Sequence, residues 1–215
     1  MMSLDTINTT ATNPLVLLSN WLQDAAAHGA FPNPNAMSLA TVDPDGRPSN
    51  RIVLCKEIDA VRGGAKFYTN YESRKAVAQA HNPFAAATFY WDAMARQARV
   101  EGVLQRLSAA ESDAYFASRP IGARIGAWVS RQSRPLASKD ELMGTFEEAG
   151  RGARGRDVSR PPHWGGYFLL ADRVELWVAR DHRLHERVLW SRPLHVNDDG
   201  SATSTGDWMS TLLYP

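Results

Sequence analysis

Ser73, Arg74 and Lys75 are the residues whose types and spacing most directly suggest chemistry. Ser73 is a good N-cap for a helix over residues 74–81, which predicts that both cations lie in the first helical turn. The positive end of the helix dipole disfavours cations there unless an anion accompanies them. Because first-turn backbone N–H groups can bind an anion, one interpretation is a phosphate site. The other is that both side chains point into water, as surface Lys and Arg commonly do.

Further basic and amide side chains lie at the ends of apolar segments. Arg51 and Lys56 bracket the apolar run 52–55, which is unusual unless such charges are paired or hold a ligand. Six more such residues flank the ends of predicted helices or strands: Arg74, Lys75, Gln97, Gln132, Arg183 and Arg187. Closure of a barrel would bring strand ends together, where Arg forks and Lys charges could bind one or two phosphate-bearing ligands. Generic surface charge is the alternative, and spacing alone leaves it open.

Other reactive side chains suggest fewer functions. His182 and His185 form an HxxH pair, but no metal site is predicted because the pair lacks a further ligand set. His185 could act as a general base, or its neighbourhood could be an exposed turn held by salt bridges. Cys55 is interpreted as a core residue and not as a nucleophile. Flat walls for a ring ligand could come from Tyr115, Trp177 and Trp190.

The bulk composition limits the classes of function. The 215 residues are 44% hydrophobic and 22% charged with a net charge of +1, so general attraction to nucleic acid or to a membrane is not indicated. Only the arginines of segment 150–163 would favour binding to nucleic acid, and their presence is better explained by a solvent-exposed loop. The single cysteine excludes a disulfide framework, and no secretory signal or membrane-length apolar run is visible. We therefore expect a cytoplasmic protein.

The elements that must position these residues can be outlined from periodicity and turn signals. Residues 1–12 are expected to be disordered, and 13–215 to form a single domain with a mobile loop at 150–163. The run 52–55 is apolar at every position, which predicts a strand buried on both faces. Helices are expected over 14–28, 74–81, 121–129, 138–149 and after the capping box that begins at Ser108. Strands are expected over 37–42, 49–58, 65–69, 85–91, 96–107, 167–170, 174–178 and 208–213, with a polar loop at 197–206.

About seven or eight strands result, with helices inserted between some of them. Because strands and helices do not alternate regularly, we predict an α+β fold built on an antiparallel barrel. No GxGxxG motif follows a strand, and Walker lysine and GxSxG motifs are absent from the sequence. A phosphate site would therefore be built from side chains.

Several motifs resemble, in order, those of the pyridoxamine 5'-phosphate oxidase family, over most of residues 14–190. They are the runs 51–56 (Arg-Ile-Val-Leu-Cys-Lys), 67–70, 73–75, 96–97, 115–120, 125–133, 164–166 and 182–187 (His-Arg-Leu-His-Glu-Arg). The resemblance implies an FMN-binding split barrel with peripheral helices. It also implies a homodimer with two FMN molecules at the subunit interface.

The resemblance also implies a role for individual positions. The FMN-binding positions would be Arg51, Ile52, Val53, Leu54, Lys56, Tyr68, Thr69, Arg74, Lys75, Gln97, Gln132, Ser133, Trp177 and Arg187, with Arg74 and Lys75 on the FMN phosphate. The substrate phosphate would meet Lys56, Tyr115 and Arg119. The catalytic positions would be Arg183 and His185, which would orient the pyridine ring of the substrate.

The implied reaction oxidises pyridoxamine or pyridoxine 5'-phosphate to pyridoxal 5'-phosphate, with hydride transfer to flavin N5 and reoxidation by dioxygen to give hydrogen peroxide. The sequence departs from the family pattern at Ala123, where a Ser usually contributes to substrate phosphate binding, and at Leu212, where an Arg is usual. A related FMN oxidase acting on another ring, of the phenazine-biosynthesis type, is therefore an alternative. A flavin- or B6-phosphate-binding protein without turnover is another.

Overall fold

The long strand β7 (Trp164–Val178) lies at the centre of the sheet in the computed structural model, which describes residues 6–197 and 200–215. Residues 164–170 of β7 pair with β4 (Gly64–Asn70), and residues 173–178 pair with β8 (Glu186–Ser191). Strand β6 (Arg96–Arg106) pairs along most of β7, with a bulge between Glu101 and Gly102. All three pairings are antiparallel, so residues of β4, β6 and β8 that are far apart in the sequence lie side by side along β7.

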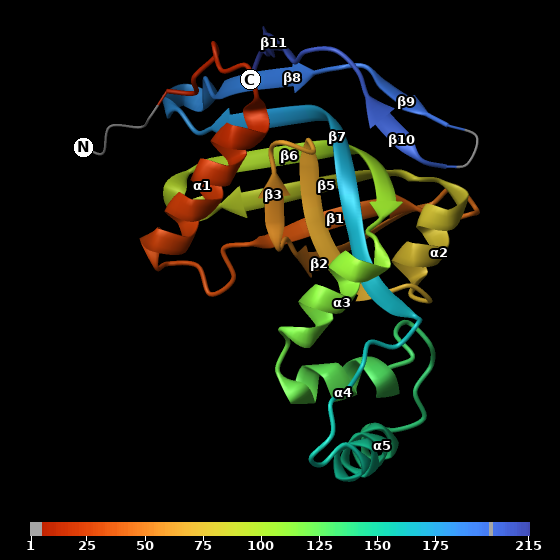
Figure 1. Cartoon of the computed structure of the whole chain (residues 1–215). Coiled ribbons are helices and arrows are strands. Elements are labelled where there is room, and N and C mark those ends of the chain that lie inside the picture. The colour runs from red at the N-terminus through yellow and green to blue at the C-terminus, as the bar shows by residue number, and fades with distance from the viewer. Residues whose placement is uncertain (1–5, 198–199) are drawn as a thin grey trace.

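The remaining strands extend this sheet in both directions (Figure 1). Its path runs β11-β8-β7-β6-β5-β1-β2, while β3 (Glu57–Asp59) pairs only with β4. The further members are β1 (Ala36–Val42), β2 (Pro48–Leu54), β5 (Phe84–Trp91) and β11 (Met209–Leu212). A separate hairpin consists of β9 (Leu194–Val196) and β10 (Ala202–Ser204). Within the described residues the sheet does not close, since its path ends at β11 and β2.

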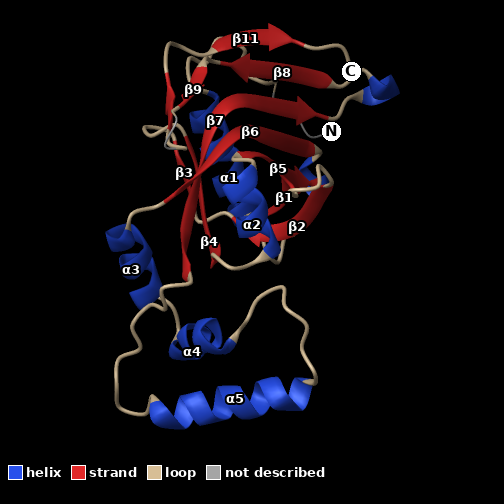
Figure 2. Cartoon of the chain, turned by 90° about the vertical axis from the view of Figure 1, so that its right-hand side faces the viewer, coloured by secondary structure: helices blue, strands red, loops and turns tan. Residues whose placement is uncertain are grey.

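Five helices accompany the sheet over the described ranges. Helix α1 (Pro14–His28) begins after Asn13, whose side chain accepts from the Leu15 N–H, and ends at Gly29 in the left-handed conformation. Helix α3 (Ala109–Ala117) begins with the predicted capping box of Ser108 and Glu111. The others are α2 (Arg74–His81), α4 (Ile121–Val129) and α5 (Lys139–Gly152). Figure 2 shows α4 and α5 lying beyond α3, away from the body of the sheet.

The core lies between α1 and the inner face of the sheet. It is formed by Leu18 of α1 and by side chains that alternate along the strands, among them Leu39, Phe67, Phe89, Val100, Tyr167, Leu176 and Trp190. Cys55 is buried in this cluster, and burial raises the pKa of its thiol to about 12. The interpretation of Cys55 as a core residue is therefore confirmed.

The predicted α+β class with a mainly antiparallel sheet is confirmed, but several element boundaries were wrong. The expected strand 49–58 is two strands, because β2 ends at Leu54 and the chain turns to pair β3 with β4. The expected strands 167–170 and 174–178 are one strand, β7, and the expected loop 197–206 contains β10. Each error arose where long-range strand pairing, and not the local sequence pattern, sets the ends of a strand.

The run 52–55 was also wrongly expected to be buried on both faces. No residue of β2 is buried, and Ile52 is 66% exposed. Strand β2 is an edge strand of the sheet, so its apolar side chains have only one neighbouring strand. This edge forms part of the site described below.

Two segments expected to lack structure make defined contacts. Residues 1–5 of the expected tail lie outside the described residues, but Ile7 is buried and its N–H donates to Glu186 Oε1 at 2.7 Å. Helix α5 continues to Gly152, inside the expected loop 150–163. Later in that loop, Arg124 Nη1 lies 2.6 Å from Asp157 Oδ1, and the Trp128 Nε1–H donates to the Ser159 carbonyl at 2.8 Å.

Candidate functional site

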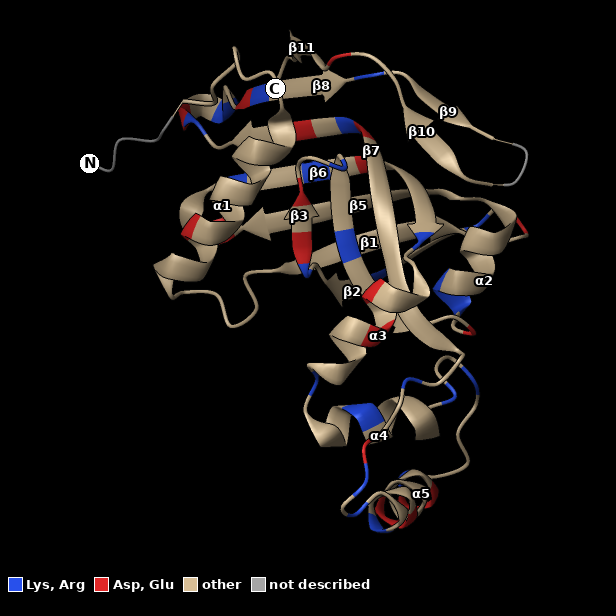
Figure 3. Ribbon diagram, viewed as in Figure 1, with Lys and Arg blue, Asp and Glu red and all other residues tan. Residues whose placement is uncertain are grey.

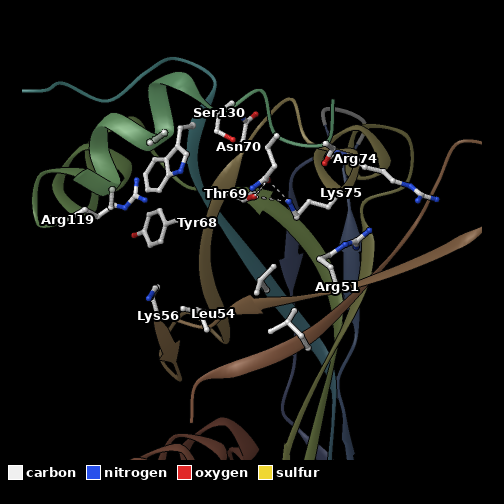
Figure 4. Close-up of a pocket in the computed structure, with 18 of the residues that line it drawn as sticks. Arg51, Leu54, Lys56, Tyr68, Thr69, Asn70, Arg74, Lys75, Arg119 and Ser130 are labelled. Atoms are coloured by element: carbon white, nitrogen blue, oxygen red, sulfur yellow. Dashed lines mark hydrogen bonds between the residues drawn. The ribbon is translucent and has the colours of Figure 1, made fainter. Parts of the chain in front are cut away.

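A cavity of about 900 Å³ opens between the edge strand β2, strand β4 and helix α4. Figure 4 shows its walls, with Arg119, Tyr68 and Lys56 at one end and Lys75, Arg74 and Arg51 at the other. The described residues that line it are Ser49 to Leu54, Lys56, Tyr68 to Asn70, Arg74, Lys75, Tyr115, Arg119, Ala123, Gly126, Ala127, Ser130, Gln132, Ser133 and Trp164. Cations at both ends of one cavity suit a ligand, or two adjacent ligands, with two anionic groups.

Lys75 is the most unusual charge in this cavity, because its side chain is buried without a carboxylate. The residue is 9% exposed, and its ammonium donates to Thr69 Oγ1 at 3.0 Å, Ser73 Oγ at 3.0 Å and Gln132 Oε1 at 2.7 Å. Burial, together with the nearby Arg51 charge, lowers the pKa of Lys75 to about 8. A buried cation bonded only to neutral groups is costly, and an anion in the cavity would offset that cost.

Ser73 is the N-cap residue of α2, as predicted, but its hydroxyl does not cap the helix. It donates to the Asn70 carbonyl at 2.7 Å and accepts from Lys75 instead. The Arg74 backbone N–H donates to Ser133 Oγ at 3.2 Å, across from the loop after α4. The helix start is therefore joined to the Gln132–Ser133 segment through side chains.

Arg51 and Arg74 flank Lys75 but are held differently. The Arg51 guanidinium donates to the Leu39 carbonyl and to the Thr41 and Ser49 hydroxyls, and burial lowers its pKa. The Arg74 guanidinium forms an ion pair with Asp43, with Nε 2.9 Å from Oδ2, and this hydrogen bond raises its pKa. In Figure 4 the Arg74 side chain points away from Lys75. If Arg74 contacts a phosphate as predicted, it would do so in addition to its ion pair with Asp43.

The opposite end of the cavity combines cations with flat rings. Tyr68 and Tyr115 stack with ring centroids 3.8 Å apart, and Trp164 stacks on Tyr68 at 5.6 Å. Lys56 Nζ lies 5.9 Å from the Tyr115 ring centroid. Gly166 makes this arrangement possible, because a Cβ there would lie 2.8 Å from Tyr68 Cε1.

Arg119 supplies the second cation at this end. Its guanidinium carbon lies 4.6 Å from the Trp164 ring centroid, and burial lowers the pKa of Arg119. Its Nη1 is buried without a hydrogen-bond partner among the described residues. A buried donor without an acceptor is costly, so this nitrogen is available to an anion in the cavity. Ala123, which lines the same cavity, offers no hydroxyl.

The cavity thus contains most, but not all, of the residues predicted from the sequence. It contains the FMN-binding positions Arg51, Ile52, Val53, Leu54, Lys56, Tyr68, Thr69, Arg74, Lys75, Gln132 and Ser133, and the substrate positions Lys56, Tyr115 and Arg119. The predicted positions Gln97, Trp177, Arg183, His185 and Arg187 do not line it. Trp190, considered as a ring wall, is fully buried in the core, and its Nε1–H donates to the Ala11 carbonyl at 3.1 Å.

Those five outlying positions gather around the C-terminal half of β7, and we call them the β7 cluster. Gln97, Trp177 and Arg187 are direct neighbours on β6, β7 and β8. The His185 ring lies 4.7 Å from that of Trp177, and its Nδ1 accepts from the Arg180 backbone N–H at 3.2 Å. Because Nδ1 is the acceptor, the ring proton is on Nε2. Arg183 is exposed and has a left-handed backbone with φ 62°.

Sequence reasoning gave no role to several residues that line the cavity. Asn70 Nδ2 donates to the Ser130 carbonyl at 3.2 Å, which joins β4 to the end of α4. Trp164, which stacks on Tyr68, was noted only as part of the motif 164–166. The Ser49 hydroxyl accepts a hydrogen bond from the Arg51 guanidinium. The Trp-Gly-Gly motif was a usable signal for Trp164, whereas the role of Asn70 depends on a contact across 60 residues.

Comparison with known proteins identifies the family. A family model described as pyridoxamine 5'-phosphate oxidase matches residues 24–150, which is more than half of the chain. The chain belongs to the pyridoxamine 5'-phosphate oxidase family. A second model, described as the pyridoxine 5'-phosphate oxidase C-terminal dimerisation region, matches residues 164–215. In this family member, β7, β8 and most of the β7 cluster fall within the dimerisation region.

Named relatives agree with the family assignment. A pyridoxine/pyridoxamine 5'-phosphate oxidase of Burkholderia mallei (strain SAVP1) is 48% identical over 204 residues, covering 94% of this chain and 89% of that protein. A protein of the same name from Burkholderia vietnamiensis is 47% identical over 206 residues, covering 95% of this chain and 90% of that protein.

Solved structures share the fold. PhzG from Burkholderia lata 383, in complex with tetrahydrophenazine-1-carboxylic acid, aligns with a TM-score of 0.84 and 29% identity, covering 96% of this chain and 94% of that chain. A pyridoxamine 5'-phosphate oxidase-related, FMN binding protein from Nostoc punctiforme aligns with a TM-score of 0.69 and 20% identity, covering 93% of this chain and 96% of that chain. The predicted split-barrel fold is therefore confirmed. Among the described helices none is long and apolar enough to span a membrane, and no described group of acidic, His or Cys residues is arranged to hold a metal ion.

Proposed function

We propose that this chain is an FMN-dependent oxidase that converts pyridoxamine and pyridoxine 5'-phosphate to pyridoxal 5'-phosphate. The observation that carries this proposal is the cavity with a cationic group at each end. Lys75 and Arg51 lie at one end, and Lys56 and Arg119 at the other (Figure 4). Two phosphate-bearing molecules that share one cavity need separate anion sites, since their charges repel each other.

The residues at the Lys75 end fit the phosphate of FMN. The buried ammonium has three neutral hydrogen-bond partners and no carboxylate, and the nearby Arg51 guanidinium adds a second positive charge. Along the same wall, Ile52 and Leu54 offer exposed apolar surface for a flat ring system. FMN held there would supply the redox chemistry, accepting a hydride from the substrate and passing the electrons to dioxygen.

The residues at the Arg119 end fit the substrate. Arg119 Nη1 has no partner among the described groups, so it can donate to a phosphate oxygen, and Lys56 adds a second charge. The stacked Tyr68 and Tyr115 rings give this end a flat, partly apolar wall. The protein's contribution would be to fix the distance and orientation between substrate and cofactor, which can supply a large part of the rate enhancement.

We further propose that the active protein is a homodimer in which the β7 cluster of one subunit completes the cavity of the other. The C-terminal dimerisation model covers Trp177, Arg183, His185 and Arg187, and none of these lines the cavity of its own chain. The exposed apolar side chains of β2 lie in the cavity wall, where a partner could cover them. In such a dimer, Arg183 and the His185 Nε2–H would orient the substrate ring.

The test is the spectrum and the oxidase activity of the purified protein. A flavin spectrum, with peroxide and pyridoxal 5'-phosphate formed from pyridoxine 5'-phosphate under air, is the expected result. The amine substrate should release ammonia as well, with water supplying the carbonyl oxygen. Anaerobic addition of substrate should bleach the flavin. A flavin that substrate never reduces would overturn the oxidase proposal and favour the binding protein without turnover.

A second candidate is a related FMN oxidase that acts on a phenazine-type ring. Ala123 favours it, because this lining residue lacks the hydroxyl that the resemblance leads us to expect beside a substrate phosphate. The PhzG structure, with its tetrahydrophenazine ligand, shows that a protein of this fold can hold such a ring. Oxygen uptake with a dihydrophenazine carboxylate but not with pyridoxine 5'-phosphate would support this candidate.

A further inference from the structure

We propose that Glu175 is a positioning residue that holds Arg187 in the orientation in which it meets the cofactor. The proposal rests on the proposed function, in which Arg187 of one subunit contacts FMN bound to the other. Glu175 itself does not line the cavity and belongs to none of the motifs noted in the sequence. Its role would be to act through Arg187.

Burial and register place Glu175 under the β7 cluster. Its position on β7 is two residues before Trp177, so both side chains lie on the same face of the sheet. The residue is 6% exposed, which is unusual for a carboxylate that has no structural or functional partner. Figure 3 shows acidic and basic residues side by side on β7 in this region.

The carboxylate binds guanidinium groups from both neighbouring strands. Glu175 Oε1 accepts from Arg187 Nε at 2.9 Å and lies 2.8 Å from Arg187 Nη2, while Oε2 accepts from Arg99 Nη1 at 3.1 Å. The two oxygens therefore have different tasks, since one holds Arg187 and the other holds Arg99. A contact to both Nε and Nη2 fixes the plane of the guanidinium as well as its position.

A count of donors shows which edge of Arg187 is left for a ligand. A guanidinium has five N–H groups. Glu175 occupies the Nε/Nη2 edge, and Nη1 donates to the Tyr214 carbonyl at 3.0 Å. One N–H on Nη1 and one on Nη2 then have no acceptor among the described residues. The free Nη2 N–H lies on the edge opposite Nε, and both free groups can donate to polar atoms of a ligand.

A second carboxylate in the same network provides a matched control. Glu101 pairs with Arg99 and with Arg173 but not with Arg187. Glu101→Gln and Glu175→Gln each remove one negative charge beside Arg99. Only the second removes the anchor of Arg187.

The experiment measures FMN dissociation constants by flavin fluorescence, with thermal unfolding as a parallel readout. We expect Glu175→Gln to raise the FMN Kd at least about tenfold, on the scale of a lost hydrogen bond between charged groups. Glu101→Gln should change the Kd less than about threefold. Equal Kd values for the two variants would overturn the proposal. If Glu175→Gln does not fold, Glu175→Asp and Glu101→Asp carry the same comparison, because the shorter Asp keeps the charge but cannot reach Arg187.

A double-mutant cycle distinguishes positioning through Arg187 from general stabilisation. In an Arg187→Gln background, Glu175→Gln should raise the FMN Kd less than about twofold further, because its target is gone. Additive effects would overturn the proposal, since Glu175 would then act without Arg187. Failure of the proposed function gives a different result: the parent protein would not bind FMN, or Arg187→Gln would leave its Kd unchanged.

Discussion

At the scale of single residues, Lys75 is the clearest case in which a group suited to ligand binding lowers the stability of the fold. A buried ammonium without a carboxylate costs folding free energy, yet three side chains are arranged to bond it. Such a residue is expected where a bound anion repays the cost of its burial. Lys75 is therefore the residue whose substitution separates ligand binding from stability most cleanly.

Lys75→Met should weaken FMN binding and stabilise the FMN-free protein. The variant keeps an apolar stem of similar length but loses the ammonium that would meet the phosphate, so the Kd for FMN should rise about 10- to 100-fold. The free energy of unfolding of the FMN-free form at pH 7 should increase, because no charge is buried. Lys139→Met is the control, since Lys139 is exposed on α5. An unchanged Kd would remove Lys75 from the phosphate site.

The same residue predicts a pH dependence of stability. The folded pKa of Lys75 is about 8 and the ordinary value is 10.5, so between these values the unfolded chain binds more protons than the folded chain. The free energy of unfolding of the FMN-free protein should therefore rise with pH across this window, by up to about 3 kcal/mol from this group. Below pH 8 the full cost of burying the charge is present.

The measurement is urea unfolding at several pH values for the parent protein and for Lys75→Met. The difference between the two isolates this lysine from other groups that titrate in the same range. A difference that stays constant from pH 7.5 to pH 10.5 would contradict the prediction.

His185 should act as a hydrogen-bond donor through Nε2, because Nδ1 accepts from the Arg180 backbone N–H. The amide nitrogen of Gln can occupy the place of Nε2, whereas Asn reaches only the place of Nδ1. Steady-state oxidase assays should therefore find that His185→Gln retains about tenfold more kcat than His185→Asn, the worth of one hydrogen bond to substrate. The reverse order would assign the essential contact to Nδ1.

At the scale of elements, the edge strand β2 and the C-terminal segment explain why the site is open in a single chain. Strand β2 has one neighbour in the sheet, so its apolar residues remain exposed on the cavity wall. The segment after β11 returns along β8, where the Leu213 N–H donates to the Arg187 carbonyl at 3.0 Å. Both elements present groups that a partner subunit could use.

Removal of residues 213–215 should weaken FMN binding although none of them lines the cavity. The truncation removes the Tyr214 carbonyl that accepts from Arg187 Nη1. We expect the Kd for FMN to rise about 3- to 10-fold, as for one modest hydrogen bond. Tyr214→Ala is the control, because the residue is 95% exposed and the substitution keeps its backbone carbonyl. Equal effects of the truncation and the Ala substitution would assign the role to the ring.

At the scale of the whole molecule, the proposed dimer makes each active site a product of two chains. Arg119 lies in the cavity and Arg183 in the β7 cluster. Arg119→Ala and Arg183→Ala should each lose most activity, and Arg183→Ala should retain FMN. In a hybrid dimer that contains one chain of each kind, one site has both substitutions and the other has neither.

Co-expression of the two variants should therefore restore activity. With random pairing, half of the dimers are hybrids with one intact site of two, so about a quarter of the parent activity is expected. The two variants mixed after purification, without subunit exchange, are the control. Co-expressed protein no more active than the mixture would mean that each site is made within one chain.

Local features of the fold were predictable from the sequence because they depend on near neighbours. The start of α1 at Asn13 and Pro14, the capping box at Ser108 and the bounds of α2 follow from caps and periodicity within a few residues. The residues of the cavity were largely predictable as well, because family motifs such as residues 51–56 contain them in order. The cationic helix start at Arg74 and Lys75 pointed to an anion site without any tertiary information.

Tertiary structure alone decided which of these residues meet. The sequence could not show that β2 is an exposed edge, since burial depends on which strands pair with it. It could not separate the cavity from the β7 cluster, because Gln97, Trp177 and Arg187 become neighbours only through the register of three strands. Nor could it show that Arg74 is paired with Asp43 while Lys75 has no acid, since charge pairing depends on side-chain distances in three dimensions. The sequence by itself determined which chemical groups are available, and the pairing of the strands determined how they are divided between two ends of one cavity and a third cluster outside it.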